Sequence, residues 1–171
     1  MRRAMAAGAG LVAGLTAAAP LQAQGLAHVS NTFTFNVSAP LERAVRLFGP
    51  EGERAWAGDK WNPEFLFPLP ASDVEGAVFT VRHGAHTSVW VNTAFDAAAG
   101  HVQYAYFLDD LLVTTIDLRL HAVDGAHTRV EVTYARTALR PEANEHVEQM
   151  GQDDRAQGKV WGDAIDAYLR R

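Results

Sequence analysis

The alternation of apolar and polar residues predicts that most of this chain forms an antiparallel β-sheet. Phe33, Phe35 and Val37 alternate with polar residues, which is the two-residue period of a strand with one buried face. A short extended stretch follows at 64–68. From Gly76 onward five further segments have strand character: 77–83, 87–95, 101–108, 112–122 and 127–137. Because the turns between these five are short, neighbouring strands are expected to run antiparallel.

Helices are predicted on both sides of this strand series. Pro40 is tolerated in the first turn of a helix and Ser38 can cap it, which predicts a short helix that stops at Gly49-Pro50. A second short helix is predicted at 51–57, and a long helix at 141–169. The pattern therefore predicts an α+β domain of about seven strands, with two short helices after the first strand and a long C-terminal helix.

The register of the last hairpin follows from the faces of its two strands. Even-numbered residues are apolar in both, so they are expected to face the core. A three-residue turn at 124–126 keeps the two faces consistent, whereas a two-residue turn does not. The longer turn sets Leu118 opposite Val132. It also sets Arg119 opposite Glu131 on the outer face, where a solvated pair contributes roughly a few tenths of a kcal/mol.

The same test on the preceding hairpin predicts a turn at 97–100. This turn places Phe95 opposite Val102 and Val91 opposite Tyr106, with both faces consistent.

Under this register two large aromatic side chains, Trp90 and Phe107, become neighbours on the outer face. Such a pair either contributes locally or belongs to an interface. We therefore predict a weak homodimer through this face; an isolated aromatic pair is the alternative.

The C-terminal helix has an apolar stripe that is interrupted in its middle. Helical spacing aligns Val147, Met150, Trp161, Ala164, Ile165 and Tyr168. Between the two ends, the same face carries Gly151, Asp154, Gln157 and Gly158. A bent helix whose polar residues reach water is one interpretation. The other, which we favour because the sheet also directs polar side chains inward, is a cavity between helix and sheet. These inward side chains are Tyr104, Tyr106, Thr114, Tyr134 and Arg136.

Composition narrows the choice of function. The 171 residues include 15 basic and 20 acidic side chains, for a net charge of -5, and no cysteine. The lack of cysteine excludes disulfides, thiolate metal sites, iron–sulfur clusters and a cysteine nucleophile. No run of Lys or Arg is present, so nucleic acid is not an expected partner.

The first 23 residues have the composition of a secretory signal peptide. Two arginines precede an uncharged stretch of Ala, Gly, Leu and Val, and cleavage is expected after Ala23. Residues 24–171 would then be a single exported domain, periplasmic or secreted. An uncleaved anchor or leader is the alternative, and without export the domain is cytoplasmic. No second apolar run approaches the ~20 residues of a spanning helix, so no stable membrane span is expected.

Four local sequences fit one known family. They are the segment 33–44, the turn Trp61-Asn62-Pro63, the strand 130–134 with Thr137-Ala138-Leu139 after it, and Val160-Trp161-Gly162. With the order of elements, they resemble the START/polyketide-cyclase superfamily (SRPBCC). The resemblance covers nearly all of residues 24–171, but its motifs are structural. It implies a helix-grip fold, in which a curved antiparallel sheet wraps around a long terminal helix, and a cavity for a small apolar or amphipathic molecule. Members include lipid and hormone binders, aromatase/cyclases and chaperone-like modules, so the resemblance assigns no activity.

Three classes of function remain open. The first, which we favour, is binding of a small hydrophobic or amphipathic molecule, such as a lipid, a polyketide or an aromatic compound. The second is a cyclase or dehydratase in which a tyrosine such as Tyr134 donates a proton, Arg136 binds an oxyanion and Asp154 is the base. The third is a protein-interaction module that uses the outer sheet face or the helix. The predicted ligand-binding residues are Trp61, Val91, Tyr104, Tyr106, Thr114, Ile116, Tyr134, Arg136, Met150, Asp154, Gln157, Gly158 and Trp161.

No metal and no other cofactor is predicted. The seven histidines flank turns, as His83 and His86 do, and lack the spacing of a metal-binding motif. Glycine-rich phosphate loops and the sequence motifs of serine nucleophiles are also absent from the sequence.

Overall fold

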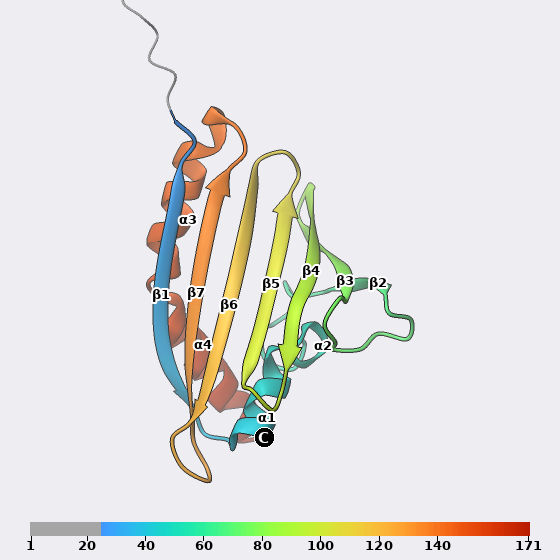
Figure 1. The fold of residues 1–171 in the computed structure, drawn as a ribbon, viewed down its shortest axis with the longest axis vertical. Coiled ribbons are helices and arrows are strands. Elements are labelled where there is room, and N and C mark those ends of the chain that lie inside the picture. Colours follow the sequence, from blue (N-terminus) through green and yellow to red (C-terminus); the bar gives the residue numbers. More distant parts are fainter. Residues whose placement is uncertain (1–24) are drawn as a thin grey trace, which may run out of the picture.

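The structure is a computed structural model that describes residues 25–171 as a curved antiparallel sheet with helices packed on it (Figure 1). The strands lie in the order β1-β7-β6-β5-β4-β3-β2. Their bounds are His28–Val37 (β1), Glu64–Phe67 (β2), Val78–His83 (β3), His86–Asp96 (β4), His101–Leu108 (β5), Leu112–Ala122 (β6) and Thr128–Ala138 (β7). The predicted signal peptide, 1–23, lies outside the described residues.

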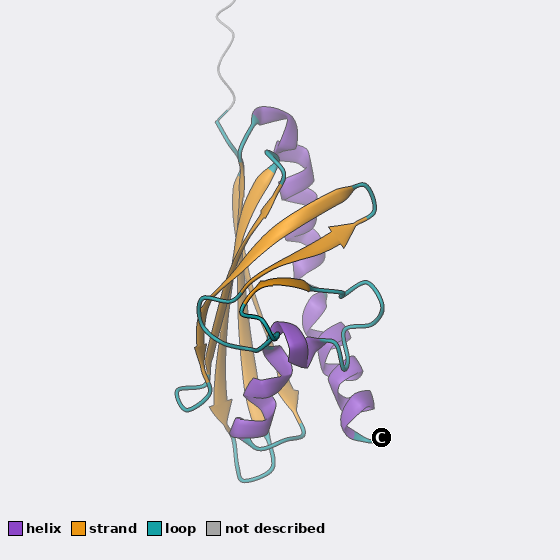
Figure 2. Ribbon diagram, turned by 90° about the vertical axis from the view of Figure 1, so that its right-hand side faces the viewer, coloured by secondary structure: helices purple, strands orange, loops and turns teal. Residues whose placement is uncertain are grey.

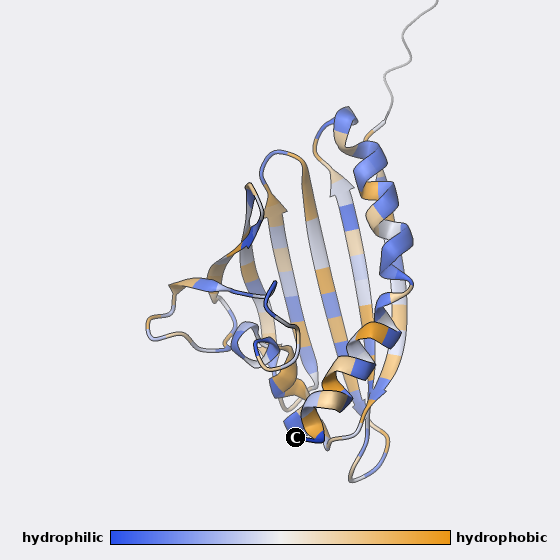
Figure 3. Cartoon of the chain, turned by 180° about the vertical axis from the view of Figure 1, so that it is seen from behind, coloured by the Kyte–Doolittle hydropathy of each residue, from blue (hydrophilic) through white to orange (hydrophobic). Residues whose placement is uncertain are grey.

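Helical segments precede and follow the main run of strands. Between β1 and β2 lie α1 (Leu41–Val45), the 3₁₀ turn η1 (Arg46–Phe48) and α2 (Pro50–Glu53); after β7 lie η2 (Pro141–Ala143), α3 (Asn144–Asp154) and α4 (Gln157–Leu169). Helices α3 and α4 pack on β1, and α3 also on β7, inside the curl of the sheet (Figures 2 and 3). Within residues 25–171, no helix has the length and apolar character needed to cross a bilayer. The predicted α+β architecture is confirmed.

The C-terminal helical segment is long, as predicted, but it is broken near its middle. The break lies at 155–156. Two glycines near it face β1: a Cβ at Gly158 would lie 3.1 Å from Cδ2 of Phe33, and one at Gly151 would lie 2.9 Å from Cγ2 of Val29. These glycines let the helices approach the strand closely. Gly158 therefore packs on β1 and does not line a cavity, because the backbone of α4 lies directly against Phe33 and Thr34.

The predicted register of the last hairpin is confirmed. Leu118 pairs with Val132, and both are fully buried, so even-numbered residues of β6 and β7 face the core. Two backbone hydrogen bonds from Val123 and Asp124 to the carbonyl of His127 close the turn. The turn residues are 124–126, as the alternation required.

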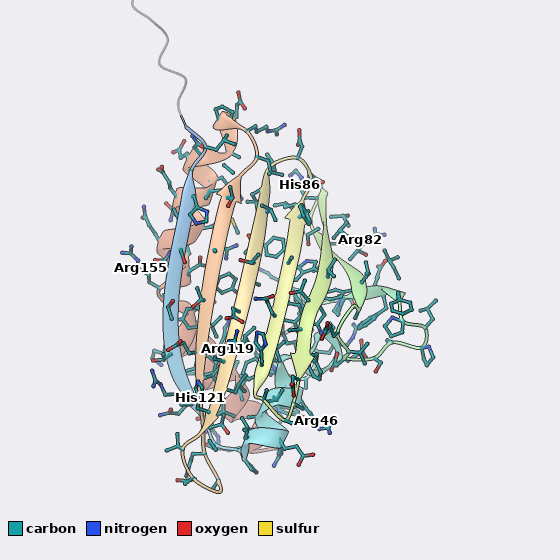
Figure 4. All side chains as sticks on the ribbon, in the orientation of Figure 1. Arg46, Arg82, His86, Arg119, His121 and Arg155 are labelled. Carbon is teal, nitrogen blue, oxygen red and sulfur yellow. The ribbon has the colours of Figure 1, made fainter. Side chains whose placement is uncertain are left out.

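Charged side chains on the outer face pair along their own strands. Arg119 lies opposite Glu131, as predicted, and Figure 4 shows Arg119 on the side of the sheet away from the helices. Its Nε nevertheless lies 3.1 Å from Asp117, and Glu131 lies 3.6 Å from Arg129. The four side chains are 31–54% exposed, so these ion pairs contribute little to stability.

A β-bulge in β4 overturns part of the preceding register. Phe95 pairs with Val102, as predicted, but the register shifts between Asn92 and Ala94. Beyond the shift, Trp90 and not Val91 lies opposite Tyr106. One extra residue reverses the face of every side chain that follows it.

The bulge also removes the basis of the predicted homodimer. Trp90 faces the concave side and is 7% exposed, whereas Phe107 is 47% exposed on the outer face opposite Val89. Trp90 and Phe107 are therefore on opposite faces, and the outer aromatic pair that motivated the dimer does not exist. Val91 likewise lies on the outer face, so the prediction that it faces the concave side is wrong.

Candidate functional site

A cavity of about 450 Å³ lies inside the curl of the sheet, bounded by α2, the loop that follows it and α4. Ligand pockets commonly enclose ~300–1,000 Å³. Its aromatic lining comprises Trp56, Trp61, Trp90, Tyr104, Tyr106, Tyr134 and Trp161. The remaining lining residues are Glu53, Ala57, Lys60, His83, Ile116, Leu118, Arg136, Gln157, Val160 and Ala164. All four tryptophans of the chain contribute to this wall.

The segment 50–61 is fixed in position by hydrogen bonds to backbone groups. The indole Nε1 of Trp56 donates to the carbonyl of Leu47 at 2.7 Å, and that of Trp61 donates to the carbonyl of Pro50 at 2.9 Å. At the start of α2, the carboxylate of Asp73 accepts backbone hydrogen bonds that the first turn of a helix leaves unpaired. One wall of the cavity is thereby held against the rest of the fold.

Trp90 is fixed on the opposite wall by a hydroxyl and a ring. Its Nε1 donates to Oγ of Ser88 at 2.7 Å, and Ser88 donates in turn to the carbonyl of Val81 at 3.1 Å. The indole stacks on Tyr106 with ring centroids 4.2 Å apart. The bulge in β4 is what brings Trp90 to this position, so the sequence-based register missed it.

Arg136 and Asp154 form a buried ion pair at the inner end of the cavity. Nε and a terminal nitrogen of Arg136 donate to the two carboxylate oxygens of Asp154 at 2.8 and 2.6 Å. The other terminal nitrogen donates to the hydroxyls of Tyr106 and Thr114 at 2.6 and 3.2 Å. The guanidinium carbon lies 4.5 Å from the ring centroid of Tyr134. This pair joins the sheet to the helix and leaves neither charge unbalanced.

The predicted catalytic roles of this pair do not fit its geometry. Both oxygens of Asp154 are bound by Arg136, so the carboxylate is not placed as a base. Burial lowers the pKa of Arg136, but the hydrogen bonds to Asp154 and the nearby Tyr106 outweigh it, so its pKa lies above its ordinary value. Arg136 is therefore a permanent cation whose charge Asp154 already balances.

Two of the cavity tyrosines, Tyr104 and Tyr134, remain protonated at neutral pH. Burial raises the pKa of Tyr134 despite the nearby positive charge of Arg136. Burial, together with the acidic groups of Glu53 and Asp73, also raises the pKa of Tyr104, whose hydroxyl donates to the carbonyl of Phe48. Both phenols are hydrogen-bonding groups at neutral pH and not bases.

Glu53 is the acidic side chain that sequence analysis missed. It is 7% exposed and lines the cavity, and it makes no hydrogen bond or ion pair with the described residues 25–171. Burial and the negative charge of Asp73 raise its pKa well above its ordinary value. The sequence contained a signal for it. On the predicted helix over 51–57, Glu53 lies three residues before Trp56, so the two side chains share one face. If Trp56 faces the core, Glu53 faces it as well.

The structure brings eight of the predicted ligand-binding residues to the cavity: Trp61, Tyr104, Tyr106, Ile116, Tyr134, Arg136, Gln157 and Trp161. Thr114 and Asp154 lie behind it as partners of Arg136. Met150 lines a neighbouring hollow of about 500 Å³ that shares His83 and Tyr106 with the cavity. Val91 and Gly158 lie elsewhere, as described above.

Metal-binding side chains do not cluster in the part of the chain that the structure describes. No group of three or more His, Cys, Asp or Glu residues among 25–171 is arranged to hold a metal ion.

Solved structures share this architecture at low sequence identity. No family model matches the chain, and no curated protein matches it. The structure of norcoclaurine synthase from Thalictrum flavum aligns with a TM-score of 0.62 at 11% identity, over 90% of this chain and 96% of that one. Ara h 8.0201 aligns at 0.59 and 16% identity, over 84% and 98%, and CalU16 from Micromonospora echinospora at 0.57 and 14%, over 87% and 85%. These likenesses show that the chain has a helix-grip fold.

Proposed function

We propose that the protein binds a small, ring-containing amphipathic molecule in the cavity. The observation that carries this proposal is the lining: seven aromatic side chains surround about 450 Å³, and five other polar side chains reach the same space. Apolar walls with a small number of placed polar groups are typical of sites for small molecules. The aromatic walls favour a compact aromatic or polyketide-like ligand over a long acyl chain, because ring faces and edges offer matched contacts to other rings.

The polar side chains in the lining give the ligand an orientation. Glu53, Tyr134 and Gln157 reach the cavity from α2, β7 and α4, respectively. Arg136 already donates hydrogen bonds to Asp154, Tyr106 and Thr114. It therefore forms part of the polar cavity wall, and its charge is not free to pair with a ligand. A cyclase or dehydratase with Asp154 as the base is not supported by this arrangement.

Energy transfer from tryptophan to N-phenyl-1-naphthylamine tests the proposal. This neutral apolar dye becomes fluorescent in dry pockets, and all four tryptophans lie in the cavity wall. We expect saturable binding of the dye with energy transfer from tryptophan. Ala164→Phe, which fills the cavity, should weaken binding at least about tenfold, equivalent to ~1.4 kcal/mol.

Ala167→Phe is the matched control, because Ala167 lies on the same helix but is exposed and outside the cavity. It should change the affinity by less than about twofold, or ~0.4 kcal/mol. No saturable binding by the wild type, or an equal effect of both substitutions, would contradict the proposal.

A further inference from the structure

Glu53 is a buried acidic group of the cavity wall that makes no ion pair with residues 25–171. Its side chain is more than nine-tenths buried and lines the cavity, with no hydrogen-bonding partner within residues 25–171. Buried polar groups in folded proteins are nearly always paired, and an unpaired one calls for an explanation. A ligand that supplies the missing partner is such an explanation.

The walls around Glu53 are suited to positive charge. Trp56 and Trp61 follow Glu53 in the chain, and Trp161 packs against Trp56 with ring centroids 5.5 Å apart. The faces of aromatic rings attract cations, Trp most strongly. The contact of Arg136 with Tyr134, at 4.5 Å, shows that this wall already holds one cation over a ring.

No ion pair within residues 25–171 would balance a negative charge on Glu53. Arg136 is neutralised by Asp154, and Lys60 is exposed at the rim. Asp73, at the start of α2, adds negative charge near Glu53.

We propose that the cavity takes an organic cation, an ammonium group carried on a small apolar or aromatic body, and that the Glu53 carboxylate balances its charge among the tryptophans. This inference rests on the proposed function and specifies its ligand class. When the cation binds, the Glu53 carboxyl releases its proton to solvent, and the ammonium group takes the place of that proton as its electrostatic partner.

The proton release gives the affinity a pH dependence of known sign. Burial and Asp73 raise the pKa of Glu53, so the free protein holds this proton beyond the ordinary range of a carboxyl group. The affinity for a cation therefore rises with pH until Glu53 is ionised, and then levels off. The other titratable or charged groups at the cavity are Asp73, His83, Tyr104, Tyr106, Tyr134, Lys60 and the Arg136–Asp154 pair. Burial and the nearby His86 lower the pKa of His83, so its positive charge is lost on the acid side of its ordinary range. The raised pKa values of Tyr104 and Tyr134 keep these two phenols neutral throughout such a titration.

Benzyltrimethylammonium is the probe for this inference, because its charge does not change with pH. We expect it to displace N-phenyl-1-naphthylamine from the wild type, more tightly at higher pH. In Glu53→Gln the affinity for the cation should fall at least about tenfold at the upper end of the range and become independent of pH. The same variant should bind the neutral dye within about twofold of the wild type.

Glu51→Gln is the matched control. It removes the same charge from the same short helix, but Glu51 pairs with Arg54 and does not line the cavity. It should leave the affinity for the cation and its pH dependence unchanged.

Calorimetry of the wild type provides a measurement that needs no variant. Titration with benzyltrimethylammonium in two buffers of different ionisation enthalpy should show release of up to one proton, below the pH at which the affinity levels off. Two results would overturn the inference and leave the proposed function standing. In the first, the dye binds but the cation does not displace it; in the second, the cation binds without releasing a proton. If the dye itself does not bind, the proposed function fails.

Discussion

Arg136 on β7 and Asp154 in the last turn of α3 are joined by two hydrogen bonds, of 2.8 and 2.6 Å, between side chains that are 6% and 5% exposed. The contact lies directly before the break between α3 and α4. It connects the helix to the sheet at the point where the helix changes direction.

Removing one partner of this pair should be strongly destabilising. Asp154→Ala leaves the Arg136 guanidinium buried without its counter-charge, which typically costs about 3–5 kcal/mol. We expect a loss of this size in the free energy of unfolding measured by chemical denaturation. Asp163→Ala is the control: it breaks the exposed pair with Lys159 on α4 and should cost less than about 1 kcal/mol. Equal losses in the two variants would show that the buried pair is not a structural link.

The two glycines of α4 should respond differently to added side chains. Gly158→Leu forces a side chain against Phe33 and the backbone of Thr34, which a Cβ would already meet at 3.1 and 3.2 Å, so we expect a loss of about 1–3 kcal/mol or more. Gly162→Ala is the comparison, because its Cβ would meet Phe35 at ordinary distances of 3.6 Å and beyond. Alanine favours a helix by up to ~1 kcal/mol over glycine, so this variant should be at least as stable as the wild type. Thermal unfolding of both variants distinguishes a tight contact from open space at Gly158.

The face of Trp90 can be tested by stability. Trp90→Ala removes a ring that is 7% exposed and stacked on Tyr106, so a loss of about 3–5 kcal/mol is expected. Phe107→Ser, on the exposed outer face, should change stability by roughly 0.5 kcal/mol. If Phe107→Ser proved the more damaging of the two in urea denaturation, the bulged register would be wrong.

Glu53 makes stability depend on pH in a definite direction. Because its pKa is raised in the folded protein, the folded state holds the proton more tightly than the unfolded chain, whose carboxyl has a pKa near 4.5. Its contribution to stability is fully present below pH 4.5 and is lost as pH rises through the folded-state pKa. Glu53→Gln removes this loss, so its stability relative to the wild type should increase from acidic to neutral pH. Unfolding curves at several pH values measure the difference, and a difference that does not vary with pH would contradict the raised pKa.

Local periodicity was sufficient for the α+β class and for the hairpin between β6 and β7. Each strand of that hairpin alternates without interruption, so the faces of Leu118 and Val132 allowed one register only. The inward positions of Tyr104, Tyr106 and Tyr134 followed from the same alternation. These features depend on neighbours within a strand or across a short turn, and such neighbours are visible in the sequence.

The site itself depended on contacts between segments far apart in the chain. A single extra residue near Thr93 placed Trp90 inside and Val91 outside, and no local pattern marked that bulge. Asp154 became the partner of Arg136, and not a base, only when α3 packed across β7. Glu53 became buried where Asp73 and the indoles of Trp56 and Trp61 hydrogen-bond to the backbone of 47–51 and hold its short helix in place. The sequence by itself determined which residues alternate, and hence the α+β architecture. Tertiary packing decided that Asp154 neutralises Arg136 and that Glu53 is buried at the cavity without an ion-pair partner among residues 25–171, because charge balance and burial depend on distances in space that the order of residues does not specify.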